Sequence, residues 1–352
     1  MDAFGRGVAD AVRASGEQRH QAEFTGTAAE YFRIWIVNLA LTILTLGIYS
    51  AWAKVRKRRY FYAHTRIAGE SFEYRGRPIA ILIGRLLALT LLVIVIAAGN
   101  FVPELSLESF SGKALFFAAA VVIGPWLLVR SSKFNASNSV YRNLRLSFLG
   151  SYASCFKLVI RSVWLLFFGI LYPYFKHRLV RYIAQNHAYG EAPFVVEEFR
   201  KPFIRAYVVA FGLGLLGAVA LIPLVGASAL AVEGAGELLP VAIYTGFLLL
   251  YAFVRARTTN AVWNAIRVGP LRFECTLRGR DYMWIYLTNV AAILVTLGFA
   301  TPWAVIRTLR YRAAKFAAFA SAPIDAITQA EGAHVGAAGQ EIAEVFDFDI
   351  AL

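Results

Sequence analysis

The chain has 352 residues, of which 59% are hydrophobic and 16% are charged, and its mean hydropathy is +0.56. Soluble domains carry about 25% charged residues, so this composition excludes an ordinary soluble protein and predicts several membrane segments. A net charge of +14 would indicate nucleic-acid binding in a soluble chain. Here basic cytoplasmic loops account for it, and we predict no nucleic-acid partner.

The first predicted element is a polar cytoplasmic N-terminus over residues 1–30, which contain no apolar core and hence no cleavable signal peptide. The apolar segment 31–62 follows and ends in TLGIYSAWAKVRKRRYFY. A basic and aromatic run beside a membrane segment is typical of contact with anionic lipid headgroups rather than nucleic acid. We therefore predict a lipid-headgroup rim from this run and its repeat: Trp52, Lys54, Arg56, Lys57, Arg58, Arg59, Trp303, Arg307 and Arg310.

Internal repeats set the predicted domain plan. The stretch NLALTILTLGIYSAWAKVRKRRY (38–60) recurs as NVAAILVTLGFATPWAVIRTLRY (289–311), and a weaker copy occupies 168–182. We name these copies unit A, and we name the two apolar pairs between them unit B. The order A-B-A-B-A fills a predicted membrane domain over 31–320, with A at 31–62, 152–182 and 282–312 and B at 79–130 and 203–255.

The distribution of positive charge predicts the topology. Cytoplasmic loops are enriched in lysine and arginine, and most of the 36 such residues would lie on one side if every A unit began and ended in the cytoplasm. We therefore predict an all-α polytopic membrane protein with about four full spans, three dipping or re-entrant helical hairpins and both termini in the cytoplasm. Seven plain spans are the alternative, since Gly and Pro are common in transmembrane helices.

Polar and helix-breaking residues within the apolar segments form the candidate site. A hairpin that returns to its own side needs a break in the helix, which we assign to Gly47, Gly169, Pro173, Gly298 and Pro302. Polar residues inside a membrane are costly and often functional, so we predict a polar path lined by Asn38, Thr45, Arg85, Asn289 and Thr296. Hydrogen bonding between helices is the alternative role for these side chains.

No motif predicts catalysis, a cofactor or a metal site. The five histidines show no ligand spacing, and Cys155 and Cys275 lie far apart in the chain. GLGLLG (212–217) matches a dinucleotide-binding pattern, but it lies within an apolar run without a preceding strand, so close helix packing explains it better. We predict that the protein is not an enzyme.

Residues 321–352 are predicted to form an acidic cytoplasmic tail. The tail carries six acidic and no basic residues and ends in EIAEVFDFDIAL, whose apolar residues are spaced like one face of a helix. Tethered charges of opposite sign attract at high effective concentration, so we expect residues 340–352 to dock on the basic loops. A solvated tail that only offsets the net charge is the alternative.

The stretch EYFRIWIVNLALTILTLGIYSAWAKVRKRRYFYAHTRIAGESFEY (30–74) resembles the YjgN-like family of bacterial inner-membrane proteins, which carry the domain of unknown function 898. The resemblance covers almost the whole chain, including FDFDI near its C-terminal end. It implies a multi-pass protein of the bacterial inner membrane. It implies no mechanism, and no catalytic residue is carried over.

The function expected from these observations is that of a channel or transporter, and a membrane scaffold or lipid-interacting protein is the alternative. Broken helices and repeated polar residues favour a channel or transporter for a small solute or ion. The basic and aromatic rim favours a non-transporting membrane scaffold or lipid-interacting protein. Anionic membrane lipids are the expected partner, and the sequence leaves a homo-oligomer open.

Overall fold

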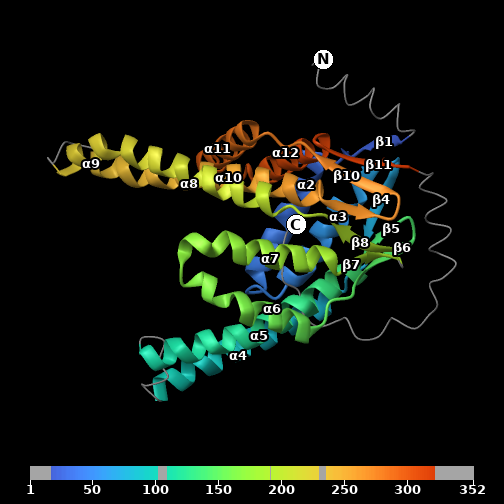
Figure 1. Ribbon diagram of the computed structural model, residues 1–352, viewed down its shortest axis with the longest axis horizontal. Helices are drawn as coiled ribbons and strands as arrows, with labels where there is room; N and C mark the ends of the chain where they lie inside the picture. The colour runs from blue at the N-terminus through green and yellow to red at the C-terminus, as the bar shows by residue number, and fades with distance from the viewer. Residues whose placement is uncertain (1–16, 102–108, 191, 230–234, 322–352) are drawn as a thin grey trace.

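The computed structural model describes residues 17–101, 109–190, 192–229 and 235–321, in which helices project from a group of short strands (Figure 1). Residues 1–16 and the acidic tail with its predicted docking lie outside this part. The strands are β1 (Gln18–Gln21), β2 (Glu23–Phe24), β3 (Thr65–Ile67), β4 (Glu70–Tyr74), β5 (Ser139–Tyr141), β6 (Leu144–Phe148), β7 (His187–Tyr189), β8 (Ala192–Val196), β9 (Ile266–Val268), β10 (Leu271–Cys275) and β11 (Phe316–Ala320).

The helices alternate with these strands along the chain. They are α2 (Ala28–Leu44), α3 (Ser50–Ala63), α4 (Pro78–Phe101), α5 (Phe110–Ser137), α6 (Tyr152–Ser162), α7 (Tyr172–Gln185), α8 (Arg200–Ala220), α9 (Ile222–Ala229), α10 (Ala235–Trp263), α11 (Gly279–Val295) and α12 (Thr301–Ala314). Two short 3-10 helices, η2 (Val163–Leu166) and η3 (Gly169–Leu171), connect α6 to α7.

All strands belong to one antiparallel sheet that closes on itself. From β2 to β11 each strand pairs with its neighbour in the chain. β1 and β2 are two parts of one strand on either side of Ala22, and β1 pairs with β11 while β2 pairs with β3. The two ends of the described chain therefore join in one ring of strands. Because closure gives both sheet edges a partner, strands of only two to five residues can stabilise one another.

The ring consists of five units of the same construction. Each unit starts with a strand, continues through two helical segments and ends with a strand that pairs with its first one. Beyond these strands the backbone repeats one hydrogen bond of 2.7 to 3.0 Å. It runs from the amides of Thr25, Arg75, Leu149, Glu197 and Thr276 to the carbonyl oxygens of His64, Asn138, Asn186, Ala265 and Lys315, in that order. These bonds define equivalent positions in units 1 to 5.

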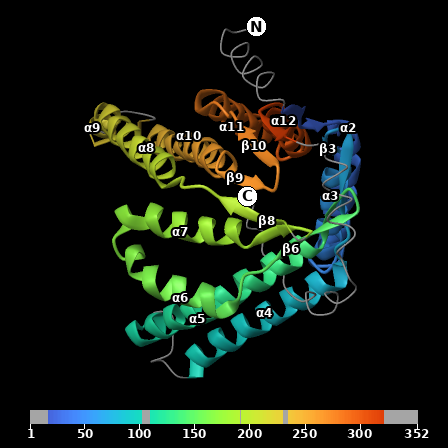
Figure 2. The same cartoon turned by 45° about the vertical axis from the view of Figure 1, so that its right-hand side comes forward.

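Short and long helix pairs alternate around the ring. Units 1, 3 and 5 hold the short pairs α2–α3, α6–α7 and α11–α12, whereas units 2 and 4 hold the long pairs α4–α5 and α8–α10. The first helix of each unit packs against the second helix of the preceding unit, and α2 packs on α12 to complete the circle. The long pairs extend farthest from the strands (Figures 1 and 2).

The centre of the ring of strands is filled by side chains. The last residues of the five closing strands (Ile67, Tyr141, Tyr189, Val268 and Ala320) belong to one hydrophobic cluster. The Tyr141 hydroxyl donates to the carbonyl oxygen of Ile67 at 2.7 Å, and the Tyr189 hydroxyl donates to that of Tyr141 at 3.0 Å. Each tyrosine thus binds the equivalent residue of the preceding unit, which links the units through the middle of the ring.

The prediction of an all-α protein is wrong, because an 11-stranded sheet organises the chain. Strands of two to five residues are too short for a period-2 pattern to stand out beside long apolar segments. Their stability comes from pairing around the ring, and that pairing joins residues as distant as Gln18 and Ala320.

The predicted number of spans is also wrong. Among the described residues three helical segments are long and apolar enough to cross a membrane, at Phe110–Ser137, Arg200–Gly226 and Glu237–Trp263. Neither four full spans with three hairpins nor seven plain spans matches this finding. The apolar parts of units 1, 3 and 5 are divided into helices of 11 to 17 residues, which are shorter than the roughly 20 residues a span requires.

Candidate functional site

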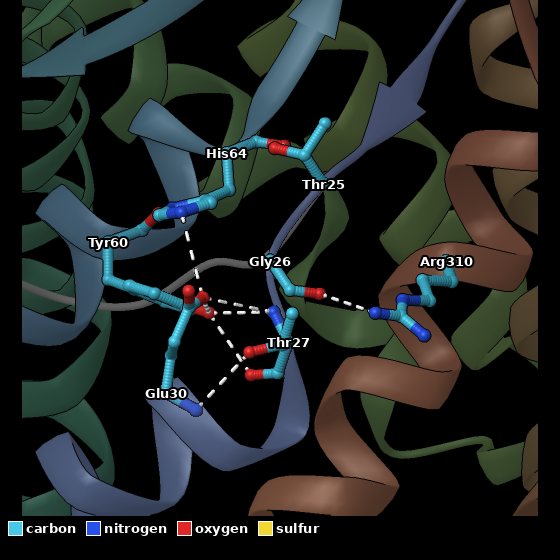
Figure 3. Close-up of polar contacts among 7 residues, drawn as sticks. All are labelled: Thr25, Gly26, Thr27, Glu30, Tyr60, His64 and Arg310. Atoms are coloured by element: carbon cyan, nitrogen blue, oxygen red, sulfur yellow. Dashed lines mark hydrogen bonds and ion pairs between the residues drawn. The ribbon is translucent and has the colours of Figure 1, made fainter.

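A cluster of polar side chains joins the start of α2 to the end of α3 (Figure 3). The Tyr60 hydroxyl lies 2.9 Å from the amide of Thr27, 3.1 Å from its carbonyl oxygen and 3.0 Å from the Glu30 carboxylate. Thr27 also caps α2 by accepting the amide of Glu30, while the Glu30 side chain accepts the amide of Thr27. His64 Nε2 lies 4.0 Å from Glu30, and Nδ1 lies 2.7 Å from the carbonyl oxygen of Tyr60.

The same tyrosine contact recurs in the other two short units. In unit 3 the Tyr182 hydroxyl binds the carbonyl oxygen of Ser151 and the hydroxyl of Ser154. In unit 5 the Tyr311 hydroxyl binds the backbone of Arg278 and the carboxylate of Asp281. The positions equivalent to His64 hold asparagine and lysine in these units. The shared function of this contact is therefore to fasten the end of the second helix to the start of the first.

The electrostatics of the unit 1 cluster agree with a structural role. Hydrogen bonds from the Thr27 side chain and from Tyr60 lower the pKa of Glu30, so this carboxyl stays ionised and accepts hydrogen bonds at neutral pH. Burial raises the pKa of Tyr60, which remains a neutral donor. Within the described residues no three or more His, Cys, Asp or Glu side chains are grouped to hold a metal ion.

Junctions between units are joined through a second set of side chains. Arg310 of unit 5 donates to the carbonyl oxygen of Gly26 at 2.9 Å, and Arg59 of unit 1 donates to that of Gly76 at 3.5 Å. The equivalent Asn260 of unit 4 binds both the amide and the carbonyl oxygen of Leu277. Arg59 and Arg310, predicted as part of a lipid rim, thus bind the backbone of the next unit. The sequence predicted no role for Asn260, although it aligns with Asn135 where the two B units end.

The remaining predicted rim residues have different surroundings. Arg58 binds the Tyr74 hydroxyl and the Asn135 amide oxygen, whereas Arg56 is exposed. Lys57 lies over the ring of Phe61, and Trp52 stacks on Tyr49. Arg307 donates to Thr288 and Asn289 and lies over Trp303, while Lys54 is partly buried on α3.

The predicted polar-path residues are mostly engaged within their own helix pairs. The Thr45 and Thr296 hydroxyls donate to carbonyl oxygens one turn earlier and accept the amides of Tyr49 and Ala300, so they stabilise the turn that follows each helix. Asn289 binds Ala304, Thr308 and Arg307 of α12. No hydrogen bond in the described part joins any two of the five predicted residues.

Asn38 and Arg85 complete the predicted polar path. Asn38 is buried, and its amide oxygen has no hydrogen-bond partner among the described residues. Arg85 of α4 donates to the Ser50 hydroxyl at the start of α3, which ties unit 2 to unit 1. Among the described residues no hydrogen bond joins Asn38 to Arg85.

The predicted helix breaks fall into two groups. Gly47 (φ +92°) and Gly298 (φ +95°) lie in the turns between the helices of units 1 and 5, where they follow Leu46 and Leu297, also in the left-handed region. Pro173 and Pro302 lie in the first turn of α7 and α12. Backbone amides in a first turn have no acceptor within the helix, so proline removes no hydrogen bond there. Gly169 begins η3.

The ends of the short helix pairs are apolar and exposed. Leu46 is 95% exposed and Leu297 is 90% exposed, and Leu44 and Val295 beside them are also exposed. The connection in unit 3 exposes Trp164, Phe167, Phe168 and Ile170. A leucine in the left-handed conformation costs about 1 to 2 kcal/mol more than one in a right-handed helix. Two such leucines at equivalent, exposed turns indicate a surface that contacts an apolar environment.

A buried histidine lies at the junction of units 3 and 4. His177 packs against the rings of Phe199 and Phe203, and its Nε2 has no hydrogen-bond partner in the described part. Burial lowers its pKa, although Glu198, 3.7 Å from Nε2, acts in the opposite direction, and Arg178, Arg181 and Arg200 lower it further. The equivalent positions of the other units hold apolar residues: Val55, Val129, Ala256 and Ile306.

We expect His177→Val to reduce the acid sensitivity of the fold. The pKa of His177 is lower in the folded than in the unfolded chain, so the unfolded chain binds more protons as the pH falls below about 6.5 and stability decreases. Thermal midpoints at pH 7.5 and 5.5 in detergent should differ less in the variant than in the wild type. His187, whose pKa burial also lowers, should keep its contribution to acid sensitivity in the variant. An equal difference in both proteins would contradict this role.

Comparison with known proteins places the chain among bacterial membrane proteins. The family described as bacterial protein of unknown function (DUF898) matches residues 19–345, which is most of the chain. The chain belongs to this family. It is 31% identical to the inner membrane protein YjgN of Salmonella typhimurium over 128 residues, and 47% identical to YjgN of Escherichia coli K12 over 55 residues.

The matches to these DUF898 relatives are partial. They cover 36% and 16% of this chain and only 30% and 14% of the two relatives. No solved structure matches the chain. The names of the relatives and the three apolar helices together support a membrane protein, and the predicted family is confirmed.

Proposed function

We propose that this DUF898 protein is a non-transporting, lipid-interacting protein of the bacterial inner membrane. In this proposal the long pairs α4–α5 and α8–α10 enter the bilayer from the ring side and return to it, and the exposed ends of the short helix pairs enter the leaflet nearest the ring of strands. The ring and both termini lie in the cytoplasm, since the basic residues concentrate on the ring side of the helices.

The observation that carries the proposal is the exposure of Leu46 and Leu297 at equivalent turns. In water these side chains and their apolar neighbours would be left without contacts, at a cost of about 1.5 to 3 kcal/mol for each large residue. In lipid the same side chains are stabilising. The short pairs project in the same direction from the strands as the membrane-crossing helices, which favours lipid as their environment (Figures 1 and 2).

Two observations favour this function over a channel or transporter. Four of the five candidate path residues bind groups within their own helix pair or an adjacent helix, as Asn289 does with α12. The ring of strands is filled by Tyr141, Tyr189 and apolar residues, so solute entering between the helices would meet packed side chains.

Spin labels on the helix ends test the proposal. Cysteines replacing Leu46 and Leu297 carry the label, and Leu149→Cys, an exposed leucine beside β6, is the matched control on the ring side. Cys155 and Cys275 are buried, which raises the pKa of each thiol to about 11 and slows its reaction. In liposomes, labels at 46 and 297 should collide more with oxygen than with a water-soluble nickel chelate, and the label at 149 should do the reverse.

The proposal fails if labels at 46 and 297 behave like the label at 149. A flux assay in the same liposomes separates the two functions. Flux of an ion or small solute that is lost in Asn289→Leu would favour the channel and contradict a non-transporting protein.

A further inference from the structure

The second helix of every unit carries an aromatic residue followed four positions later by an arginine. The arginine always lies eight residues before the carbonyl that accepts the repeated backbone bond, so the five positions are equivalent. The pairs are Trp52 with Arg56, Trp126 with Arg130, Tyr174 with Arg178, Phe253 with Arg257, and Trp303 with Arg307. The repeats in the sequence align the first, third and last pairs as copies of unit A, whereas the equivalence of the other two pairs follows from the ring.

The two members of a pair share one helix face. Residues four apart on a helix are neighbours, and the guanidinium lies over the aromatic ring in units 2, 4 and 5, at 5.6, 5.6 and 5.1 Å from the ring centre. Trp126, Tyr174 and Trp303 are 39 to 42% exposed. The aromatic residue is one turn farther from the strands than its arginine, because each second helix runs toward the ring.

The second helix of each unit also has a buried packing face. On α3 the buried face carries Ala51 and Val55, and Arg58 and Tyr62 bind side chains of α5 and β5. The positions equivalent to Ala51 and Val55 are buried in every other unit. The arginines of units 1, 3 and 4 are exposed, although Arg178 also donates to Ser162 of its own unit. Trp52 and Phe253 pack partly against residues of the next unit.

The length of the two long second helices sets the level of these arginines relative to a bilayer. About 20 helical residues cross the hydrocarbon core. Counted from Phe110, where α5 begins, and from Glu237, where the apolar part of α10 begins, 20 residues end next to Arg130 and Arg257. Both arginines thus lie at the cytoplasmic edge of the hydrocarbon, with Trp126 and Phe253 just inside it, the depth at which aromatic belts lie.

We propose that the five pairs form a belt that binds anionic phospholipid headgroups around the cytoplasmic face of the protein. This proposal rests on the proposed function and names its lipid class. The ring of strands brings Arg56, Arg178 and Arg307 to the level fixed by the long helices. Each guanidinium offers several donors to a phosphate, and Arg56, Arg178, Arg257 and Arg307 have no carboxylate partner in the described residues.

The test is Arg56→Gln/Arg257→Gln, which removes two exposed belt arginines that make no hydrogen bond or ion pair with another helix among the described residues. The full-length protein is purified in detergent and titrated with phosphatidylglycerol or phosphatidylcholine, and bound lipid is counted by native mass spectrometry. The charge-matched control is Arg66→Gln/Arg145→Gln, which removes two exposed arginines on β3 and β6. Arg56→Lys/Arg257→Lys restores the charge without the planar guanidinium.

We expect phosphatidylglycerol binding to weaken about 30-fold in the belt variant, because each basic residue at a membrane surface contributes about 1 kcal/mol. The control should bind as the wild type, and the lysine variant should fall between them. Unchanged binding in the belt variant, or an equal loss in the control, overturns the proposal. If the double variant does not fold, the single variants decide by the same criterion, each with about a five-fold loss. The spin labels at 46 and 297 report on the helix ends independently of lipid binding by the belt. If the belt binds lipid while the helix ends lie in water, the proposed function is contradicted and the belt is not.

Discussion

Gly150→Ala should destabilise the protein by about 1 to 3 kcal/mol, the usual cost of forcing extra atoms into a packed core. A Cβ at Gly150 would lie 2.4 Å from the Phe148 ring and 2.8 Å from the Tyr182 hydroxyl. Neither group can move freely, since Phe148 is buried against Tyr182 and His187, and Tyr182 fastens the start of α6. The free energy of unfolding in detergent measures this effect.

The matched control is Gly212→Ala in α8, where a Cβ would meet no atom within 4 Å. It should leave stability unchanged or raise it by up to about 1 kcal/mol, because alanine favours the helix. A similar loss in both variants would show that the effect of Gly150→Ala is not due to the Phe148 ring.

A second variant identifies the ring as the cause. In units 1, 2 and 3 an aromatic residue stands two positions before a glycine, as Phe148 does before Gly150. In units 4 and 5 the glycine is replaced by Glu198 and Leu277, and the aromatic residue is replaced by Val196 and Cys275. Phe148→Val should therefore reduce the cost of Gly150→Ala. Additive free-energy changes in this double-mutant cycle would contradict the explanation.

Asn260→Ala should cost about 2 to 5 kcal/mol of stability. The Asn260 amide donates to the carbonyl oxygen of Leu277 at 2.9 Å, and its oxygen accepts the amide of Leu277 at 3.0 Å. Leu277 is 3% exposed, so both backbone groups would lose their partner away from water, at about 1 to 3 kcal/mol each. Asn264 makes the same pair of bonds to Cys275, so α10 serves as an edge partner for the end of β10.

The control for Asn260→Ala is Gln185→Ala, which removes an exposed amide at the end of α7 and should change stability by less than about 0.5 kcal/mol. Equal stability of Asn260→Ala and the wild type in a denaturant titration would mean that water replaces both bonds.

The predicted rim residues show that the sequence alone does not determine which basic side chains can face lipid. The run from Arg56 to Arg59 reads as one basic cluster, yet Arg56 is exposed, Arg58 binds Tyr74 and Asn135, and Arg59 binds the backbone of Gly76. Successive residues point in directions about 100° apart on a helix. Adjacent charges therefore meet different neighbours, and only the packing around the helix decides which of them can face lipid.

The sequence by itself determined that this is a membrane protein and which family it belongs to. Membrane character follows from composition and from long apolar segments, because each residue contributes to burial in lipid independently of its distant neighbours. The family follows from a residue pattern that is local to the chain, and its match extends over residues 19–345.

The tertiary structure alone decided the closed ring and the equivalence of its five units. The strands are too short to be stable singly, and the partner of β1 is β11, almost 300 residues later. The arginine-bearing helices α3, α7 and α12 look related in sequence, whereas α5 and α10 do not resemble them. Long-range backbone pairing makes the five arginine positions equivalent, because hydrogen bonds between strands fix positions that side-chain patterns do not encode.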